Sequence, residues 1–441
     1  MINTQTTRVR WYLIFWLFLL SAIGFLDRVN ISVAGSALAL AYHLSNIRLG
    51  WVFSSFLVGY ALFQTPAGRL ADAFGPRRVL ALGVIWWGIF TALTASLPLG
   101  ISAALTLLIL IRFLLGTGEA VMYPASNQFV ARWIPSRERG IANGWIFAGV
   151  GAGAGISPPL ITYVVLKFGW RVSFWLCAVI GVIAGVLWYV IARDRPEDHP
   201  SVSAVELTYI RSGLTLKADR TAGAEADHPS WRTLFRSRDV LAMTLSYFSF
   251  GYVAWIFFSW FYIYLAQARG LNLKATAAYA MLPFLGMALG CPLGGIISDR
   301  LTRKRGAQLG RCVLASCAML IATGFLAFGS LVHSAAAATI VLASGAAALY
   351  LAQSSFWSVS ADIGDAASGF VSGFMNMGAQ LGAATTASLT PWIADRWGWT
   401  ASFLVAAGLC FVGAFSWLIV NPARTLVAVN TSSSKPVYAS N

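Results

Sequence analysis

Long apolar stretches recur through this 441-residue chain and constrain its fold more than any other feature. A helix needs about 20 mostly apolar residues to cross a bilayer, and the hydrocarbon core admits only structures that satisfy their own backbone hydrogen bonds. Only 11% of the residues are charged, too few to cover a water-exposed surface. We therefore predict an all-α integral membrane protein with twelve transmembrane helices. They are expected at 11–41, 48–70, 78–98, 101–131, 138–166, 171–192, 239–267, 274–298, 308–330, 335–361, 367–394 and 399–420.

The basic residues between these stretches predict the orientation. If both termini lie on one side, that side holds 23 of the 31 Lys and Arg residues, the other side holds six, and Arg28 and Arg112 fall within helices. Because cytoplasmic segments carry such an excess, we expect both termini in the cytoplasm. The net charge of +15 does not indicate a nucleic-acid partner, since the basic residues alternate with apolar stretches instead of gathering on one surface.

Charge and proline content divide the chain. Residues 193–238 are charged, contain three prolines and have no apolar run of membrane length, although 205–216 fits an amphipathic surface helix. The C-terminal residues are rich in Ser and Thr. We therefore predict four segments: an N-terminal six-helix bundle (1–192), a cytoplasmic linker (193–238), a C-terminal six-helix bundle (239–421) and a disordered cytoplasmic tail (422–441).

Two patterns occur once in each half. Residues 68–72 (Gly-Arg-Leu-Ala-Asp) and 295–299 (Gly-Ile-Ile-Ser-Asp) end a helix, precede basic residues and are offset by 227. Gly-Trp pairs at 169–170 and 398–399 are offset by 229. Nearly equal offsets indicate a duplicated six-helix unit, an arrangement typical of transporters that bind substrate between their halves. Glycine permits close helix approach and the acids can pair across the inner surface, so we expect a conformational latch in each half. Its predicted residues are Gly68, Asp72, Arg77 and Arg78, and Asp299 and Arg303.

Four ionisable residues lie deep within predicted helices: Asp27, Arg28, Arg112 and Glu119. Charges at this depth are costly and usually functional. Asp27 and Arg28 point about 100° apart, whereas Arg112 and Glu119 share a helix face. The set is neutral when empty, so an entering carboxylate would be balanced by protonation of one acid, which frees an arginine for bidentate binding. We therefore expect Asp27 and Glu119 to couple protons, and Arg28 and Arg112 to bind a small organic anion.

The sequence contains no nucleotide-binding motif, no cluster of metal ligands and no hydrolytic triad. The five cysteines lie in or beside apolar stretches without a CxxC pair, which is typical of small buried residues. We therefore expect a transporter and not an enzyme, with no metal and no cofactor, and with protons as the coupling ion.

The stretch 68–78, Gly-x-x-x-Asp-x-x-Gly-x-Arg-Arg, resembles the loop signature of the major facilitator superfamily, and the resemblance covers about residues 8–421. Asp27-Arg28 in the first helix, with Arg112 and Glu119 in the fourth, is similar to the anion:cation symporter family, which includes bacterial galactonate, hexuronate and glucarate transporters. The resemblance implies the same roles for these four residues, uptake by alternating access, a bacterial inner membrane and a monomer. Tyr60, Phe356-Trp357 and Asn376 also match this family.

Four further substrate contacts are expected from polar and aromatic residues within the helices, Gln353, Ser354, Trp357 and Asn376, and the resemblance adds Tyr60. The resemblance favours a sugar acid such as a hexonate or hexuronate. Phe25 departs from the family, because sugar-acid members often carry Tyr there, and this favours the alternative of an aromatic acid or dicarboxylate. A drug efflux antiporter and a transporter-like sensor are weaker alternatives, because the helices hold two arginines and the linker resembles no signalling domain.

Overall fold

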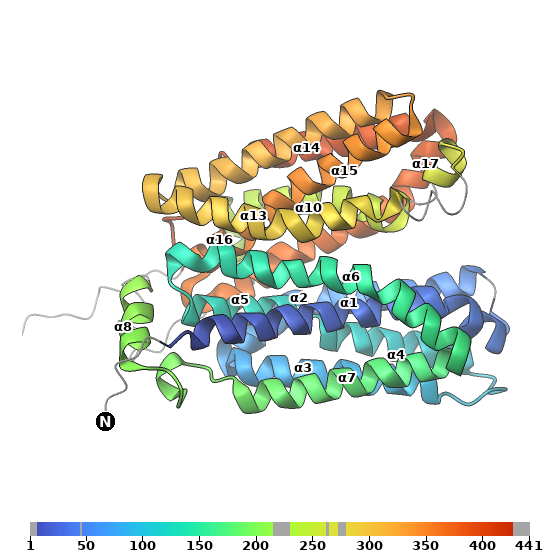
Figure 1. The fold of residues 1–441 in the computed structure, drawn as a ribbon, viewed down its shortest axis with the longest axis horizontal. Coiled ribbons are helices and arrows are strands. Elements are labelled where there is room, and N and C mark those ends of the chain that lie inside the picture. The colour runs from blue at the N-terminus through green and yellow to red at the C-terminus, as the bar shows by residue number, and fades with distance from the viewer. Residues whose placement is uncertain (1–6, 45, 215–229, 262–263, 272–278, 427–441) are drawn as a thin grey trace, which may run out of the picture.

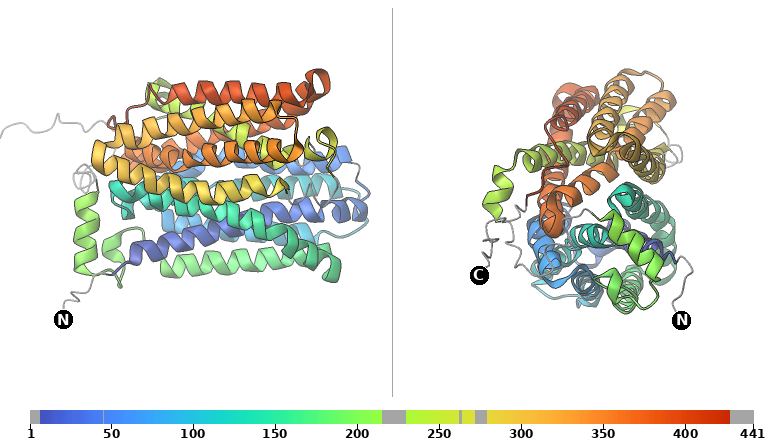
Figure 2. Two further views of the ribbon diagram at one scale, coloured as in Figure 1. Left: turned by 45° about the horizontal axis from the view of Figure 1, so that its top comes forward. Right: turned by 90° about the vertical axis from the view of Figure 1, so that its left-hand side faces the viewer.

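Two bundles of long helices lie side by side in the computed structural model (Figures 1 and 2). The structure describes residues 7–44, 46–214, 230–261, 264–271 and 279–426. Every regular element in these ranges is a helix. The predicted all-α fold is therefore confirmed.

The first bundle follows the predicted order of six spans. The fourth span, expected at 101–131, consists of two helices separated only by Ala120 and Val121. The helices are α1 (Val9–Ala41), α2 (Asn46–Phe74), α3 (Pro76–Ser96), α4 (Ala104–Glu119), α5 (Met122–Trp133), the 3-10 turn η1 (Ser136–Glu138), α6 (Arg139–Phe168) and α7 (Trp170–Ile191).

The second bundle also contains six spans. Two helices form the predicted span 335–361, whereas one continuous element contains the last two spans and changes direction at Gly398, where φ is 82°. The elements are α10 (Arg238–Ser259), the π-helical turn η4 (Tyr264–Ala268), α13 (Leu282–Arg305), the π-helical turn η5 (Gln308–Val313), α14 (Leu314–Leu331), α15 (Ala335–Leu351), α16 (Gln353–Gly364), the 3-10 turn η6 (Asp365–Ala367) and α17 (Ser368–Ser416).

Short helices form the described part of the linker. They are η2 (Pro196–Asp198), α8 (Ala204–Gly213) and α9 (Trp231–Arg236). The amphipathic helix expected at 205–216 corresponds to α8. We call the end of the molecule that carries α8 and the start of α1 the α8 end (Figure 1). The predicted disorder of the tail falls mostly on residues 427–441, outside the described residues.

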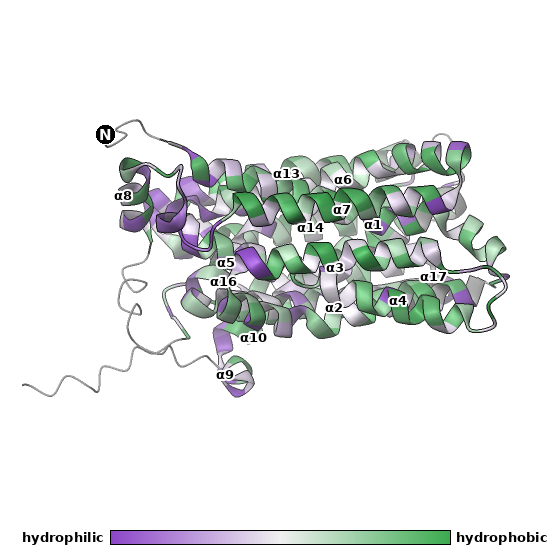
Figure 3. Cartoon of the chain, turned by 90° about the horizontal axis from the view of Figure 1, so that it is seen from below, coloured by the Kyte–Doolittle hydropathy of each residue, from purple (hydrophilic) through white to green (hydrophobic). Residues whose placement is uncertain are grey.

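Hydrophobic residues predominate along the lengths of the helices, and hydrophilic residues gather most densely at the α8 end (Figure 3). Ten helical segments of the described chain are long and apolar enough to cross a membrane. One of these, Ala335–Ala387, extends over two of the predicted spans, and α2 adds 29 further helical residues. Large exposed side chains such as Leu82, Leu166 and Leu289 suit contact with lipid chains.

Asp72 and Asp299 join the two bundles at the α8 end in the same way. Asp72 on α2 accepts hydrogen bonds from the backbone N–H groups of Gly369 (2.9 Å) and Phe370 (2.8 Å) at the start of α17. Asp299 on α13 accepts from Gly140 (2.9 Å) and Ile141 (2.7 Å) at the start of α6. Each carboxylate thus compensates the unpaired N–H groups and positive dipole of a helix N-terminus in the other bundle.

Gly68 and Gly295 allow these contacts. A Cβ atom on Gly68 would lie 1.9 Å from the carbonyl oxygen of Gly369, and one on Gly295 would lie 2.3 Å from that of Gly140. Neither approach leaves room for a larger residue. The duplicated glycine and acid of the two sequence patterns therefore form one repeated device.

The latch arginines lie elsewhere. The Nε atom of Arg77 donates to the carbonyl oxygen of Tyr189 in the same bundle (2.8 Å), and its backbone N–H donates to Asp194 (2.9 Å). Arg78 and Arg303 are exposed. The two acids thus bridge the bundles through backbone amides of the opposite bundle, and Arg77, Arg78 and Arg303 take no part in these hydrogen bonds.

Candidate functional site

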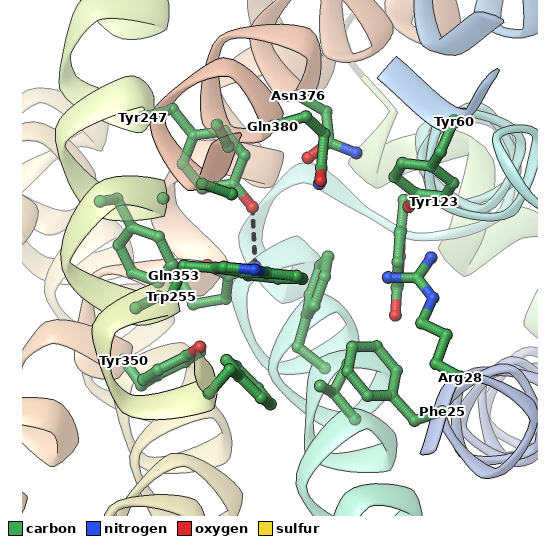
Figure 4. Close-up of a pocket in the computed structure, with 18 residues that line it drawn as sticks. Phe25, Arg28, Tyr60, Tyr123, Tyr247, Trp255, Tyr350, Gln353, Asn376 and Gln380 are labelled. Atoms are coloured by element: carbon green, nitrogen blue, oxygen red, sulfur yellow. Dashed lines mark hydrogen bonds between the residues drawn. The ribbon is translucent and has the colours of Figure 1, made fainter. Parts of the chain in front are cut away.

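A cavity lies between the two bundles, near the middle of their length. Residues of α1, α2, α5 and α6 form one wall, and residues of α10, α15, α16 and α17 form the other (Figure 4). The lining residues are Phe25, Arg28, Tyr60, Tyr123, Phe147, Val150, Tyr247, Phe250, Gly251, Ala254, Trp255, Phe258, Tyr350, Gln353, Asn376, Ala379, Gln380 and Ala383. Among them, Arg28 is the only one with a formal charge at neutral pH.

Arg28 connects the cavity to a buried acid. Its guanidinium group reaches the cavity wall, and its Nε atom donates to Oε1 of Glu119 at 2.5 Å. Glu119 is 2% exposed, and its Oε2 atom has no hydrogen-bond partner within the described residues. Loss of either partner of an ion pair at this depth would leave an uncompensated buried charge, so the charge states of Arg28 and Glu119 depend on each other.

Aromatic rings surround the same guanidinium group. It lies 4.4 Å from the ring centroid of Tyr60 and 4.9 Å from that of Phe25. Cation–π contacts of this length favour a cation in a site with little water. The rings therefore hold Arg28 in place while leaving its Nη atoms directed toward the cavity (Figure 4).

Asp27 points away from the cavity. Its Oδ2 atom accepts a hydrogen bond of 2.7 Å from the hydroxyl of Thr91 on α3, and the carboxylate is 3% exposed. Arg112 is also buried and lies close enough to Asp27 and Glu119 for electrostatic attraction. The four intramembrane charges thus form one buried cluster, of which Arg28 alone reaches the cavity in this conformation.

Tyr247 organises the opposite wall. Its hydroxyl oxygen accepts hydrogen bonds from Nε2 of Gln353 (2.9 Å) and from Nε1 of Trp357 (3.0 Å). With both acceptor positions filled, the remaining capacity of this hydroxyl is to donate its proton. Tyr247 lines the cavity, so its hydroxyl is placed to donate a hydrogen bond to a bound anion.

The residues predicted for substrate binding and proton coupling divide into those that line the cavity and those that lie outside its lining. Tyr60, Gln353 and Asn376 line the cavity, and Nδ2 of Asn376 donates to Gln64 of the other bundle at 2.9 Å. Ser354 and Trp357 are fully or almost fully buried behind the wall. Among the acids and arginines, Asp27, Arg112 and Glu119 lie outside the lining and Arg28 lies within it.

Several lining residues were not predicted. Tyr123, Tyr247, Tyr350 and Trp255 belong to a chain in which 14% of residues are aromatic, so their residue type alone does not distinguish them. Tyr123 follows Glu119 by four residues, which places both on one helix face. That spacing is the only sequence signal that favoured any of these aromatic residues.

The cavity is closed toward the α8 end by contacts between the bundles. Nη1 of Arg139 on α6 lies 2.7 Å from Oδ1 of Asp362 on α16, and Arg311 on η5 pairs with the other oxygen of the same carboxylate. Asn127 donates to Ser360 at 3.1 Å. These contacts lie beside the Asp72 and Asp299 bridges and complete the closure.

No group of three or more His, Cys, Asp or Glu residues that could hold a metal ion occurs in the described ranges. The cavity offers a guanidinium group, phenol hydroxyls and amides. Such a donor set suits an anion with additional hydrogen-bonding groups.

A membrane-embedded duplicated bundle with a charged cavity between its halves defines a transporter. The chain belongs to the Major Facilitator Superfamily, whose model matches residues 17–386. It is 32% identical over 408 residues to a probable sulfoacetate transporter, SauU, of Cupriavidus necator, with 92% of each chain covered. It is also 32% identical to a probable galactarate/D-glucarate transporter, GudP, of Bacillus subtilis, with 72% of each chain covered. These relatives place it in the anion:cation symporter group of the superfamily. In fold it resembles the proton:xylose symporter XylE, with a TM-score of 0.73, 16% identity and coverage of 94% and 98%.

Proposed function

We propose that this protein takes up a small organic anion together with protons by alternating access between its two bundles. The observation that carries the proposal is the 2.5 Å bond between Arg28, which faces the cavity, and Glu119, which is buried behind it. The anion site and the proposed proton site thus share one ion pair.

The coupling follows from charge balance. While Glu119 is ionised, it occupies the Nε atom of Arg28 and neutralises its charge. Protonation of Glu119 removes that attraction and leaves an uncompensated guanidinium group facing the cavity, which then binds a carboxylate or sulfonate. Asp27 and Arg112 form the second acid–arginine combination of the cluster, and we propose that Asp27 also exchanges a proton during the cycle.

A sugar acid is the substrate class that we favour. Its carboxylate would bind Arg28, and its hydroxyl groups would find partners in Tyr60, Tyr247, Gln353 and Asn376 on both walls. The relative from Bacillus subtilis, named for galactarate and D-glucarate, supports this class. Binding to both walls would draw the bundles together, as alternating access requires.

A second candidate is a compact or aromatic anion. Phe25 supplies no hydroxyl beside Arg28. Six other apolar residues, aromatic or aliphatic, line the cavity from α6 and α10. The relative that is named for sulfoacetate covers 92% of the chain. An aromatic acid, a dicarboxylate or a short sulfonate would therefore need fewer hydroxyl partners than a sugar acid needs.

The location follows from the charge distribution. We propose that the α8 end faces the cytoplasm, because the excess of Lys and Arg residues lies in segments at that end. With the α8 end closed, the cavity would open toward the exterior. We also propose that the protein works as a monomer in a bacterial inner membrane.

Uptake into proteoliposomes tests the proposal. We expect labelled galactarate, galactonate or galacturonate to accumulate under an inward proton gradient, and both Arg28→Ala and Glu119→Gln to reduce the initial rate more than about 100-fold, because each removes a charge from a buried pair. Sulfoacetate and benzoate, as competitors, separate the two substrate classes.

The exposed pair of Arg211 and Glu197, at 3.0 Å on the linker side, supplies matched controls. Arg211→Ala and Glu197→Gln change the same charges outside the membrane and are expected to leave uptake unchanged. Accumulation that persists in folded Arg28→Ala and Glu119→Gln protein would sink the proposed mechanism. Accumulation that does not depend on the proton gradient would contradict the proposed proton coupling, while the proposed anion site would still stand.

A further inference from the structure

A second hollow lies at the α8 end, apart from the cavity between the bundles. Its volume is about 650 Å³, and it is formed by α9, the start of α10 and the last described residues of the chain. The lining residues are Ser230, Arg232, Thr233, Arg236, Ser237, Asp239, Arg424, Thr425 and Leu426. No step of the proposed transport cycle uses these residues.

We propose that this groove binds the phosphate headgroup of an anionic phospholipid. The proposal rests on the cytoplasmic orientation of the α8 end given above, and not on the identity of the transported substrate. The positive charge, the apolar residues and the position of α9 each support a lipid.

The groove is cationic. Arg232, Arg236 and Arg424 line it, and all three are exposed. The one acid, Asp239, lies 3.6 Å from Arg424 and also accepts the backbone N–H of Asn421 at 2.7 Å. Asp239 therefore offsets Arg424, whereas Arg232 and Arg236 have no acidic partner within 4.0 Å among the described residues.

The spacing of α9 separates its cations from its apolar residues. Arg232 and Arg236 are four residues apart and share one face of the helix, and Trp231 and Phe235 are likewise four apart on the neighbouring face. Trp231 is 39% exposed and Phe235 is 57% exposed, whereas Leu234 is fully buried. Basic residues beside partly exposed aromatic residues are typical of helices that lie in a membrane interface.

The position of α9 also fits the interface. A single residue, Ser237, separates it from α10, the first span of the second bundle. Figure 3 shows α9 projecting from the side of the bundle at the α8 end, where lipid headgroups would surround it. A basic segment immediately next to a spanning helix is the usual position for recognition of anionic lipids.

The groove adjoins the closure between the bundles. The ring centroid of Trp231 lies 5.5 Å from that of Phe370, and Phe235 lies 5.1 Å from Phe374. Phe370 is one of the two residues whose backbone N–H groups bind Asp72. A lipid held at α9 would thus sit directly behind one of the two bridges.

Native mass spectrometry of the purified full-length chain tests the proposal. Phosphatidylglycerol, phosphatidylcholine and inorganic phosphate are titrated separately onto the wild type and onto the triple variant Arg232→Gln, Arg236→Gln, Arg424→Gln. Each basic residue near an anionic surface contributes roughly fivefold in affinity. We expect the wild type to prefer phosphatidylglycerol to phosphatidylcholine, and the triple variant to lose about 25-fold in affinity for phosphatidylglycerol, since two arginines lack an offsetting acid.

A triple variant of Arg300, Lys304 and Arg305 to Gln is the matched control, because it removes three exposed charges of α13 at the same end. It is expected to bind phosphatidylglycerol like the wild type. Equal losses in both triple variants would show general charge attraction and overturn the site. Unchanged binding in the α9 variant, or inorganic phosphate binding as tightly as the lipid, would also overturn it. Thermal melting of each variant confirms that the compared proteins are folded.

Discussion

Adjacent residues of α1 have separate environments. Arg28 faces the cavity and binds Glu119, whereas Asp27 faces α3 and accepts a hydrogen bond from Thr91. The offset of about 100° between neighbours in a helix produces this separation. One turn of helix can therefore present a cation to the cavity while a carboxylate stays in the protein interior.

Tyr247 is the residue on which the second wall depends. Replacing it with Phe removes the acceptor for Gln353 and Trp357 and leaves two buried donors unpaired. An unsatisfied buried group costs about 1–3 kcal/mol. We expect Tyr247→Phe to raise the apparent KM for uptake about tenfold, measured from initial rates in proteoliposomes.

Tyr252→Phe is the control for that variant. Tyr252 lies on the same helix, is fully buried, and its hydroxyl has no hydrogen-bond partner among the described residues. Loss of this hydroxyl is expected to leave the apparent KM unchanged. Equal changes in the two variants would mean that losing any buried hydroxyl on α10 alters uptake, and would contradict a specific role for the hydrogen bonds of Tyr247.

At the scale of elements, α8 fixes the start of α1. The buried carboxylate of Glu206 on α8 accepts the backbone N–H groups of Val9 (3.0 Å) and Arg10 (3.2 Å), and the hydroxyl of Thr7 (2.6 Å). The linker thus supplies the acid that the first turn of α1 lacks. The helix α8, which the sequence predicted as a surface helix, thus caps the N-terminus of the membrane span α1.

Stability should depend on this cap and on pH. Burial alone would raise the pKa of Glu206, but the hydrogen bonds from Thr7, Val9 and Arg10 outweigh it and lower the pKa. The carboxylate therefore adds stability above its unfolded pKa of about 4.3, and that stability is lost as pH falls through the lower, folded value. We expect Glu206→Gln to lower the Tm by about 2–4 °C at pH 7.

A melting series from pH 7 to pH 3 checks the sign of this effect. The difference in Tm between the wild type and Glu206→Gln should shrink toward the acidic end, provided the chain stays soluble. Glu197→Gln, an exposed linker substitution, is expected to change the Tm at pH 7 by much less. A difference that grows on acidification would contradict the assigned role of the carboxylate.

At the scale of the whole molecule, closure at the α8 end is built from two repeated bridges and one central acid. Asp72 and Asp299 bind helix N-termini of opposite bundles, and Asp362 lies between Arg139 of the first bundle and Arg311 of the second. All three carboxylates act across the same interface. Opening at this end must therefore break contacts on both sides of the pseudo-twofold arrangement together.

Asp362→Asn tests the central contact. Removing one partner of a buried ion pair costs about 3–5 kcal/mol because the remaining charges stay buried, and here two arginines would lose their carboxylate. We expect the closed state to lose population. The measurement is the rate at which N-ethylmaleimide modifies a cysteine introduced at the fully buried Ser360, followed by peptide mass spectrometry.

Asp395→Asn, at an exposed acid, serves as the control and should leave the modification rate unchanged. A rate in Asp362→Asn equal to that of the parent would mean that the closure does not depend on this carboxylate. Faster modification in both variants would indicate general loosening and not a gate.

The sequence predicted the spans well because hydropathy is a local property. It placed twelve spans, but it did not predict that the fourth is divided into α4 and α5. It also selected Arg28, Tyr60, Gln353 and Asn376, which line the cavity. It did not distinguish Tyr123 and Tyr247, since aromatic residues are common throughout the chain and only the folded arrangement brings these two to the cavity.

The sequence by itself determined the membrane class, the duplication and the four intramembrane charges, because apolar stretches, repeated motifs and charges within a span are local properties of the chain, and a charge at that depth is costly. The tertiary structure decided the partners. It paired Asp72 and Asp299 with helix N-termini of the opposite bundle, directed Arg28 and not Asp27 into the cavity, and placed Glu206 at the start of α1. These contacts join residues about 90 to 300 positions apart, and only the packing of the helices brings such residues together.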